Sequence, residues 1–141
     1  DPNNIKNLDY LMQKNKYDIA TLASKIQNVE ELQNTNIVKV ETFENLDNSN
    51  FIKAKDFFRK TINVNKEHIY HHIGIYAFSK NALSRFVKLS RTKNEIERKL
   101  EQMRALDNNI EIGVALSKSF PLGIDTEEDF LLIKKSMEYK G

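Results

Sequence analysis

The chain has 141 residues, of which 22 are Lys or Arg and 20 are Asp or Glu, so its formal net charge is only +2. This length suits one ordinary domain with a substantial core, and the even mixture of charges gives no electrostatic argument for binding nucleic acid. The sequence has no Cys, which excludes a cysteine nucleophile, and no long apolar run. We therefore expect a soluble, cytoplasmic protein that does not enter a membrane.

The first part of the chain combines an amphipathic helical pattern with several extended ones. Residues 1–14 predict a helix in which Asp1 is the N-cap and Ile5, Leu8 and Met12 form the buried stripe. The stretch NVEELQ predicts a short helix or turn. Runs rich in β-branched or aromatic residues predict strands at 17–23, 36–42 and 51–58.

The stretch HHIGIYAF predicts a strand with two adjacent histidines. His72, Gly74 and Tyr76 share one face of such a strand and His71 lies on the other, so the two histidines cannot bind one metal ion. Adding His68 does not complete a tetrahedral zinc site. Gly74 either leaves a notch for a polar ligand between His72 and Tyr76, or marks a bulge or close helix contact beside a hydrogen-bonded histidine.

Residues 79–89 predict a helix with Leu83, Phe86 and Val87 on its apolar side.

Residues 92–106 predict a further helix, because Thr92 and Glu95 have the spacing of a capping box. Its buried stripe is expected to comprise Ile96, Leu100, Met103 and Leu106. Glu101 and Gln102 fall on its two flanks, where the spacing alone indicates a solvated, charged helix face.

The remaining pattern is a strand followed by a loop and a helix. Residues 110–117 predict a strand that points Ile110, Ile112, Val114 and Leu116 inward. Asp125 precedes a helix capped at Thr126. Its carboxylate either forms an Asx turn that leads into the helix, or binds a magnesium ion that also holds a nucleotide phosphate.

Strands interleaved with helices predict an α/β fold, a mixed sheet flanked by helices in one compact unit. A ligand crevice is expected outside the carboxyl ends of the strands. The four glycines form neither a P-loop nor a dinucleotide-binding motif, and no G-x-S-x-G stretch occurs. These patterns alone do not specify a reaction.

The stretches HHIGIYAF, LEQMRAL and GIDTEEDF, in this order and at these separations, closely resemble the carboxy-terminal part of the 3-deoxy-manno-octulosonate cytidylyltransferases, the CMP-Kdo synthetases of lipopolysaccharide synthesis. DIATLA and NIVKV are also similar to segments of that family. The resemblance implies a nucleotide-diphospho-sugar transferase-like fold, with residues 1–141 as a partial domain for sugar binding and dimerisation. It also implies transfer of CMP from CTP to Kdo with release of pyrophosphate, Mg²⁺ as cofactor and a homodimer.

The resemblance also implies roles for individual residues. His72 and Tyr76 match the histidine and tyrosine that bind the sugar, and Glu101 and Gln102 match a glutamate and glutamine that reach its hydroxyls. Asp125 matches a magnesium-binding aspartate. No catalytic residue in the strict sense is assigned within this chain.

Two departures from the family pattern lead to further expectations. The family's phosphate-binding loop and first magnesium aspartate would lie upstream of Asp1, so the chain is expected to be a fragment. The family's Y-F-S-R stretch corresponds here to NFIKAKDFF, with Ile52 in place of Ser and Lys53 in place of Arg. Lys53 keeps the charge of a substrate-binding residue but lacks the bidentate fork, which predicts weaker binding or a different substrate choice.

Two alternatives remain open. The chain could be an inactive remnant or interaction module that keeps the fold, or a sister cytidylyltransferase for another acidic sugar.

Overall fold

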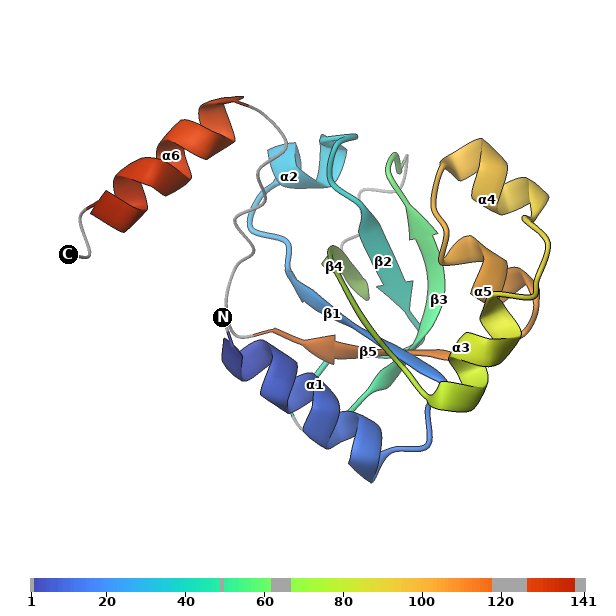
Figure 1. Ribbon diagram of the computed structural model, residues 1–141. Helices are drawn as coiled ribbons and strands as arrows, with labels where there is room; N and C mark the ends of the chain where they lie inside the picture. Colours follow the sequence, from blue (N-terminus) through green and yellow to red (C-terminus); the bar gives the residue numbers. More distant parts are fainter. Residues whose placement is uncertain (1, 49, 62–66, 118–126, 139–141) are drawn as a thin grey trace.

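The computed structural model describes residues 2–48, 50–61, 67–117 and 127–138. In these ranges five strands form one mixed sheet that closes on itself in the order β1-β4-β2-β3-β5 (Figure 1). The strands are β1 Ile19–Lys25, β2 Lys39–Thr42, β3 Ile52–Phe58, β4 Ile69–Phe78 and β5 Ile112–Leu116. β1 and β5 are parallel and the other neighbours are antiparallel. The predicted mixed sheet flanked by helices is therefore confirmed.

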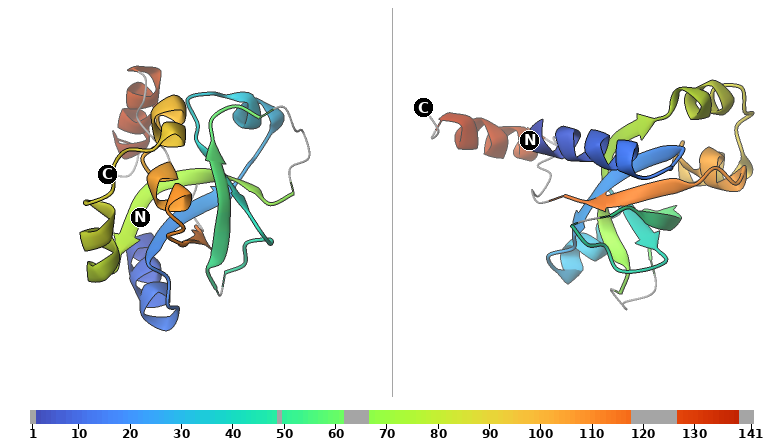
Figure 2. Two further views of the ribbon diagram at one scale, coloured as in Figure 1. Left: turned by 90° about the vertical axis from the view of Figure 1, so that its right-hand side faces the viewer. Right: turned by 90° about the horizontal axis from the view of Figure 1, so that it is seen from below.

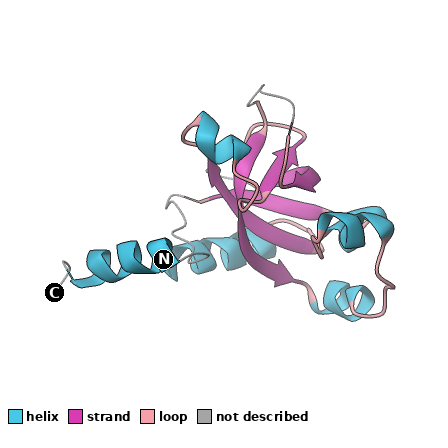
Figure 3. Cartoon of the chain, turned by 90° about the horizontal axis from the view of Figure 1, so that it is seen from above, coloured by secondary structure: helices cyan, strands magenta, loops and turns pink. Residues whose placement is uncertain are grey.

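Helices lie around this sheet, with α3, α4 and α5 together at one end and α1 on the opposite side (Figures 1 and 2). They are α1 Pro2–Lys14, α2 Val29–Gln33, α3 Lys80–Phe86, α4 Lys93–Arg98, α5 Met103–Asp107 and α6 Glu127–Glu138. α6 extends away from the strands (Figure 3). None of the helices in the described ranges has the length and apolar character needed to cross a bilayer.

The core consists of two apolar clusters on the two faces of β1. Ile19 and Ala23 belong to the larger cluster, which includes residues of α3, α5 and the other four strands. Ala20 and Leu22 belong to a smaller one, which α1 completes with Leu8 and Leu11. Because β1 is apolar on both faces, it can be buried at the centre of the molecule.

The apolar stripe of α1 differs from the predicted one. Leu8 and Leu11 are buried, Met12 is half-buried and Ile5 is exposed. The predicted N-cap Asp1 lies outside the described residues.

The prediction for the 79–89 helix is wrong in part. Ser79 is the N-cap and its side chain accepts a hydrogen bond from the Ala82 amide. The buried positions are Ala82 and, in part, Phe86, whereas Leu83 and Val87 are exposed. The helix contacts the sheet through only one narrow row of side chains, so the rest of its apolar face remains in solvent.

The predicted single helix at 92–106 is also wrong. The capping box of Thr92 and Glu95 is present, but α4 ends at Arg98, and its C-cap Lys99 adopts a left-handed conformation with φ of 55°. α5 then begins at Met103. Ile96, expected in the buried stripe, is 55% exposed, and the buried residue of α4 is instead the charged Glu95.

The strand predicted at 110–117 is confirmed as β5, but its burial is not one-sided. Ile112 and Val114 pack in the larger cluster and Ala115 packs in the smaller one. Gly113 lies against the rings of Tyr17 and Phe51. Both faces of β5 are therefore covered, like those of β1, its parallel neighbour.

Candidate functional site

β4 contains a bulge where it runs beside β1. Thr21 pairs with Tyr76, but the next residue of β1, Leu22, pairs with Ile73, so Gly74 and Ile75 have no partner in this ladder. Gly74 is exposed, and a Cβ atom added to it would meet no atom within 4 Å. The interpretation of Gly74 as the mark of a bulge is therefore confirmed.

His72 is a buried, hydrogen-bonded histidine. Its side chain is held by Thr21 Oγ1, which lies 3.0 Å from Nε2, and by an edge-to-face contact with Phe57 at a centroid distance of 5.1 Å. Burial lowers the pKa of His72 to about 3, and the nearby His71 contributes to the same shift. His72 is therefore neutral at physiological pH.

The neutral state of His72 predicts acid sensitivity. The unfolded chain binds a proton at this imidazole near the ordinary pKa of 6.5, whereas the folded chain binds it only near a pKa of about 3. This part of the stability is complete above pH 6.5 and declines, as pH falls toward 3, by about 1.4 kcal/mol per pH unit. Urea unfolding at pH 6.0, 5.5 and 5.0 should show the free energy of unfolding falling with pH. In His72→Gln this pH dependence should be smaller by about 1.4 kcal/mol per pH unit, the contribution of one proton. An unchanged slope in the variant would contradict the prediction.

A cavity of about 140 Å³ lies between β4 and the turn that joins α4 to α5, and Tyr76, Glu101 and Gln102 supply its polar groups. Its apolar walls are Ile19, Phe78, Phe86, Ala105 and Ile112. The hydroxyl of Tyr76 is buried and finds no hydrogen-bond partner among the described residues. Burial, together with the negative charge of Glu101, raises the pKa of this phenol. His72 adjoins the cavity through Tyr76, since their ring centroids are 5.4 Å apart.

Glu101 and Gln102 reach the cavity because the chain turns between α4 and α5. After the left-handed Lys99, the amide of Leu100 still donates to the carbonyl of Glu95, and Leu100 is buried. Gln102 then occupies the position before α5, and its side chain makes no capping hydrogen bond. The amide of Gln102 is therefore not used to cap α5.

A buried ion pair between Glu95 and Arg104 joins α4 to α5 and so stabilises this turn. Glu95, only 1% exposed, accepts hydrogen bonds from Arg104 Nε at 2.8 Å and Arg104 Nη2 at 2.5 Å. These hydrogen bonds are the main reason why the pKa of Glu95 is lowered to about 2. The guanidinium of Arg104 also lies 4.8 Å from the ring centroid of Phe86, a wall of the cavity. The sequence showed Glu95 only as part of a capping box and gave no signal for its pairing with Arg104.

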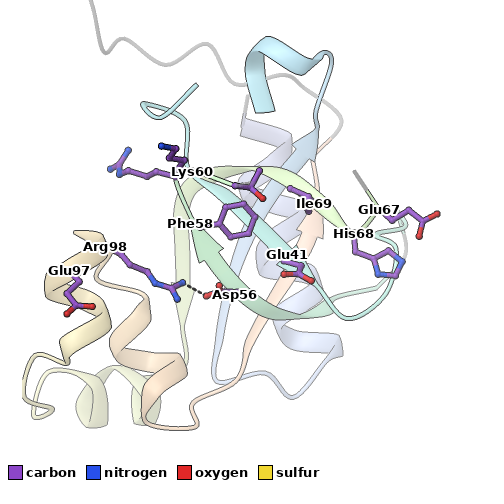
Figure 4. A pocket seen from close by; sticks show the side chains of 11 residues that line it. Glu41, Asp56, Phe58, Lys60, Glu67, His68, Ile69, Glu97 and Arg98 are labelled. Carbon is purple, nitrogen blue, oxygen red and sulfur yellow. Dashed lines mark hydrogen bonds and ion pairs between the residues drawn. The ribbon is translucent and has the colours of Figure 1, made fainter. Parts of the chain in front are cut away.

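A larger hollow, of about 780 Å³, lies beside the ends of β2 and β3 and the start of β4 (Figure 4). Its arginines already have partners. Arg98 Nη1 is 2.6 Å from Asp56 Oδ1, and Arg59 Nη1 donates to the carbonyl of Asn36 at 3.0 Å. The small cavity, in contrast, contains a buried hydroxyl without a partner in the described structure, so we take the small cavity as the candidate site.

Comparison with known proteins identifies the family of this chain. The sequence model of a family described as cytidylyltransferase matches residues 2–112. The chain belongs to the cytidylyltransferase family.

Two curated relatives of this cytidylyltransferase chain are named 3-deoxy-manno-octulosonate cytidylyltransferase. The protein from Paramagnetospirillum magneticum is 42% identical over 112 residues, which are 79% of this chain and 45% of the relative. The protein from Brucella ovis is 40% identical over 129 residues, which are 92% of this chain and 51% of the relative. The chain thus spans about half the length of the curated relatives it matches.

A solved structure shows the same fold. It is that of a CMP:2-keto-3-deoxy-manno-octonic acid synthetase complexed with CTP, and it matches with a TM-score of 0.81 over 99% of this chain and 57% of the solved chain. The sequence identity is 23%, so this likeness concerns the fold alone.

The structure of the cytidylyltransferase chain places Lys53 apart from the other predicted site residues. Its Nζ lies 2.5 Å from Glu111 Oε1 and 5.9 Å from the ring centroid of Phe43. Lys53 and Phe43 line a separate hollow with Tyr17, and Lys53 is not among the residues that line the small cavity. The substrate-binding role of Lys53 stays a prediction.

The predicted magnesium ligand Asp125 lies outside the described residues. Within the described ranges, no group of three or more His, Asp or Glu side chains could hold a metal ion. Magnesium binding by this chain therefore stays a prediction.

Proposed function

We propose that this chain is the sugar-binding portion of a CMP-Kdo synthetase, which transfers CMP from CTP to Kdo and releases pyrophosphate for lipopolysaccharide synthesis. The names of the relatives from Paramagnetospirillum magneticum and Brucella ovis support the reaction. The observation that supports the sugar site is the buried Tyr76 hydroxyl, which has no partner in the described structure and faces a cavity shared with Glu101 and Gln102.

The groups around the cavity suit a polyhydroxylated ligand. The phenol of Tyr76 can donate and accept a hydrogen bond, the carboxylate of Glu101 accepts, and the amide of Gln102 does both. Phe78 and Ile112 add apolar wall, which fits the C–H surface of a sugar. The cavity is smaller than the roughly 300–1,000 Å³ of common small-molecule sites, so we expect it to hold one end of the sugar.

The role of this chain in the transfer is to position the acceptor. Nucleotidyl transfer requires a sugar oxygen aligned with the α-phosphorus of CTP, and alignment of two reactants removes much of the entropic barrier. The residues around the cavity hold the sugar and keep water away from its buried end. Mg²⁺ at Asp125, the contact of Lys53 with substrate, a homodimer and a cytoplasmic location belong to the proposal on the strength of the resemblance.

Kdo titration tests the proposed site. We expect Kdo to bind this chain, and Tyr76→Phe to weaken binding about tenfold, because a hydrogen bond to a buried hydroxyl contributes about 1.4 kcal/mol. Isothermal titration calorimetry measures both affinities. Tyr10→Phe is the matched control, since Tyr10 lies exposed on α1 and its variant should bind Kdo normally.

The outcomes separate the proposal from its alternatives. Equal Kdo affinity for the Tyr76→Phe variant would place the sugar elsewhere. Binding of another acidic sugar in preference to Kdo would indicate a sister cytidylyltransferase, and binding of neither would favour an interaction module. Pyrophosphate release that requires CTP and Kdo together would extend the proposal from binding to catalysis by this chain.

A further inference from the structure

The hydroxyl of Thr21 lies beneath the bulge of β4 and is in contact with three polar atoms. Thr21 is fully buried at 0% exposure. Its Oγ1 lies 2.8 Å from the carbonyl oxygen of Ile75, 3.2 Å from that of Ile73 and 3.0 Å from Nε2 of His72. One side chain thus joins both carbonyls that flank Gly74 to the buried imidazole.

The number of protons on the Thr21 hydroxyl, the two carbonyls and the His72 imidazole determines which group donates each hydrogen bond. A threonine hydroxyl has one proton, and a carbonyl oxygen can only accept. If Thr21 donated its proton to His72, its oxygen would lie 2.8 Å from the Ile75 oxygen with no proton between them. The consistent arrangement is that Thr21 donates to the bulge carbonyls and accepts a hydrogen bond from Nε2–H of His72.

We propose that Thr21 is a positioning residue that fixes His72 in the Nε2–H form and fastens the bulge beside Tyr76. His72 then keeps an unprotonated Nδ1, which no described residue hydrogen-bonds, as an acceptor. Burial, which disfavours the imidazolium, supports the neutral form that this arrangement requires.

The proposed tautomer determines which part of a sugar ligand can bind beside His72 and Glu101. This consequence rests on the proposed function. Nδ1 of His72 and the carboxylate of Glu101 both accept hydrogen bonds, so they favour a hydroxyl and disfavour a carboxylate. The hydroxyl-bearing part of an acidic sugar therefore fits beside His72, and its carboxylate belongs at a different position. Thr21 acts on the ligand only through His72 and Tyr76.

The first test is the nitrogen NMR spectrum of His72 in the ligand-free chain. We expect a protonated, exchange-protected Nε2 and an unprotonated Nδ1 in the wild-type chain and in Thr21→Ser, which keeps the hydroxyl. Thr21→Val, which is nearly isosteric and lacks the hydroxyl, should lose the protection of Nε2–H. Thr42→Val is the matched control, because the Thr42 hydroxyl is also buried but bonds the carbonyls of Glu44 and His68.

A protonated Nδ1 in the wild-type chain overturns the proposal, even if Thr21→Val does not fold. An unchanged His72 spectrum in a folded Thr21→Val chain also overturns it. Kdo affinity is the second readout, with a loss of about tenfold expected in Thr21→Val and recovery in Thr21→Ser. The expected spectra without any Kdo binding would leave the role of Thr21 standing and contradict the proposed function alone.

Discussion

Replacement of Glu95 by Gln should lower the free energy of unfolding by about 3 kcal/mol, one of the two largest effects expected in this chain. Glu95 is buried and pairs with Arg104 through two hydrogen bonds. The glutamine side chain would keep the shape of the glutamate but leave the partly buried charge of Arg104 without its hydrogen-bonded partner. Urea unfolding at pH 7 measures the loss.

Glu97→Gln on the same helix is the control for this substitution. Glu97 is exposed and makes only a 3.7 Å contact with Lys93, so its variant should change stability by less than about 0.5 kcal/mol. Equal losses for the two variants would contradict the assignment of a special role to the buried pair.

Acid should reduce the difference between the Glu95→Gln variant and the wild-type chain. The folded-state pKa of Glu95 is about 2, below its ordinary 4.5, so the stabilisation is complete above pH 4.5 and declines as pH falls through 2. Below that range the protonated Glu95 resembles a glutamine.

Gly113→Ala should lower the free energy of unfolding by about 2 kcal/mol through overpacking. A Cβ atom on Gly113 would lie 2.9 Å from Cγ of Tyr17 and 3.0 Å from Cβ of Phe51. The contacted atoms lie close to the backbone, and the two rings pack edge to face at a centroid distance of 5.6 Å, so flipping either ring would not relieve the contact. Thermal and urea unfolding of the variant measure the effect.

Gly74→Ala is the matched control, because the space around Gly74 is open and neither of the two glycines has a positive φ. Its stability should stay within about 0.5 kcal/mol of the wild-type value. A larger loss for Gly74→Ala than for Gly113→Ala would contradict the packing described for both positions.

Most strands could be predicted because their local patterns agree with their burial. In β3, the alternation of Ala54 with the exposed Lys53 and Lys55 is visible in the sequence. The burial of Phe57 is out of phase with that alternation, since a bulge between β2 and β3 shifts the register near Glu41. A bulge depends on the partner strand, so single-strand periodicity cannot reveal it.

The break between α4 and α5 could not be predicted from the local sequence pattern, for a different reason. The apolar spacing from Ile96 to Leu106 is compatible with one continuous helix. In such a helix, Glu95 and Arg104 would lie about 13 Å apart along the axis. Their direct contact requires the chain to turn at Lys99, and that contact is a tertiary interaction.

The assignment of Glu101 and Gln102 to the candidate site came from a family resemblance and not from local chemistry. Spacing alone placed Glu101 and Gln102 on a solvated helix face, whereas the structure brings both to one cavity with Tyr76. The same resemblance assigned Lys53 to the substrate, but Lys53 pairs with Glu111 beside a different hollow. The position of a charged residue along a strand determines the face of the sheet to which it points. It does not determine which cavity lies on that face.

The pairing of β1 with β5 has a consequence for how the chain folds. Ile19 lies opposite Ile112, so two central strands come from nearly opposite ends of the described chain. The entropy of closing so long a loop must be overcome before the core of β1 is covered, which makes folding slow relative to helical proteins of this size. During synthesis, β1 remains without its parallel neighbour until β5 has left the ribosome. In that interval one edge of β1 lacks its hydrogen-bonding partner, and an unpaired strand edge is a site for aggregation.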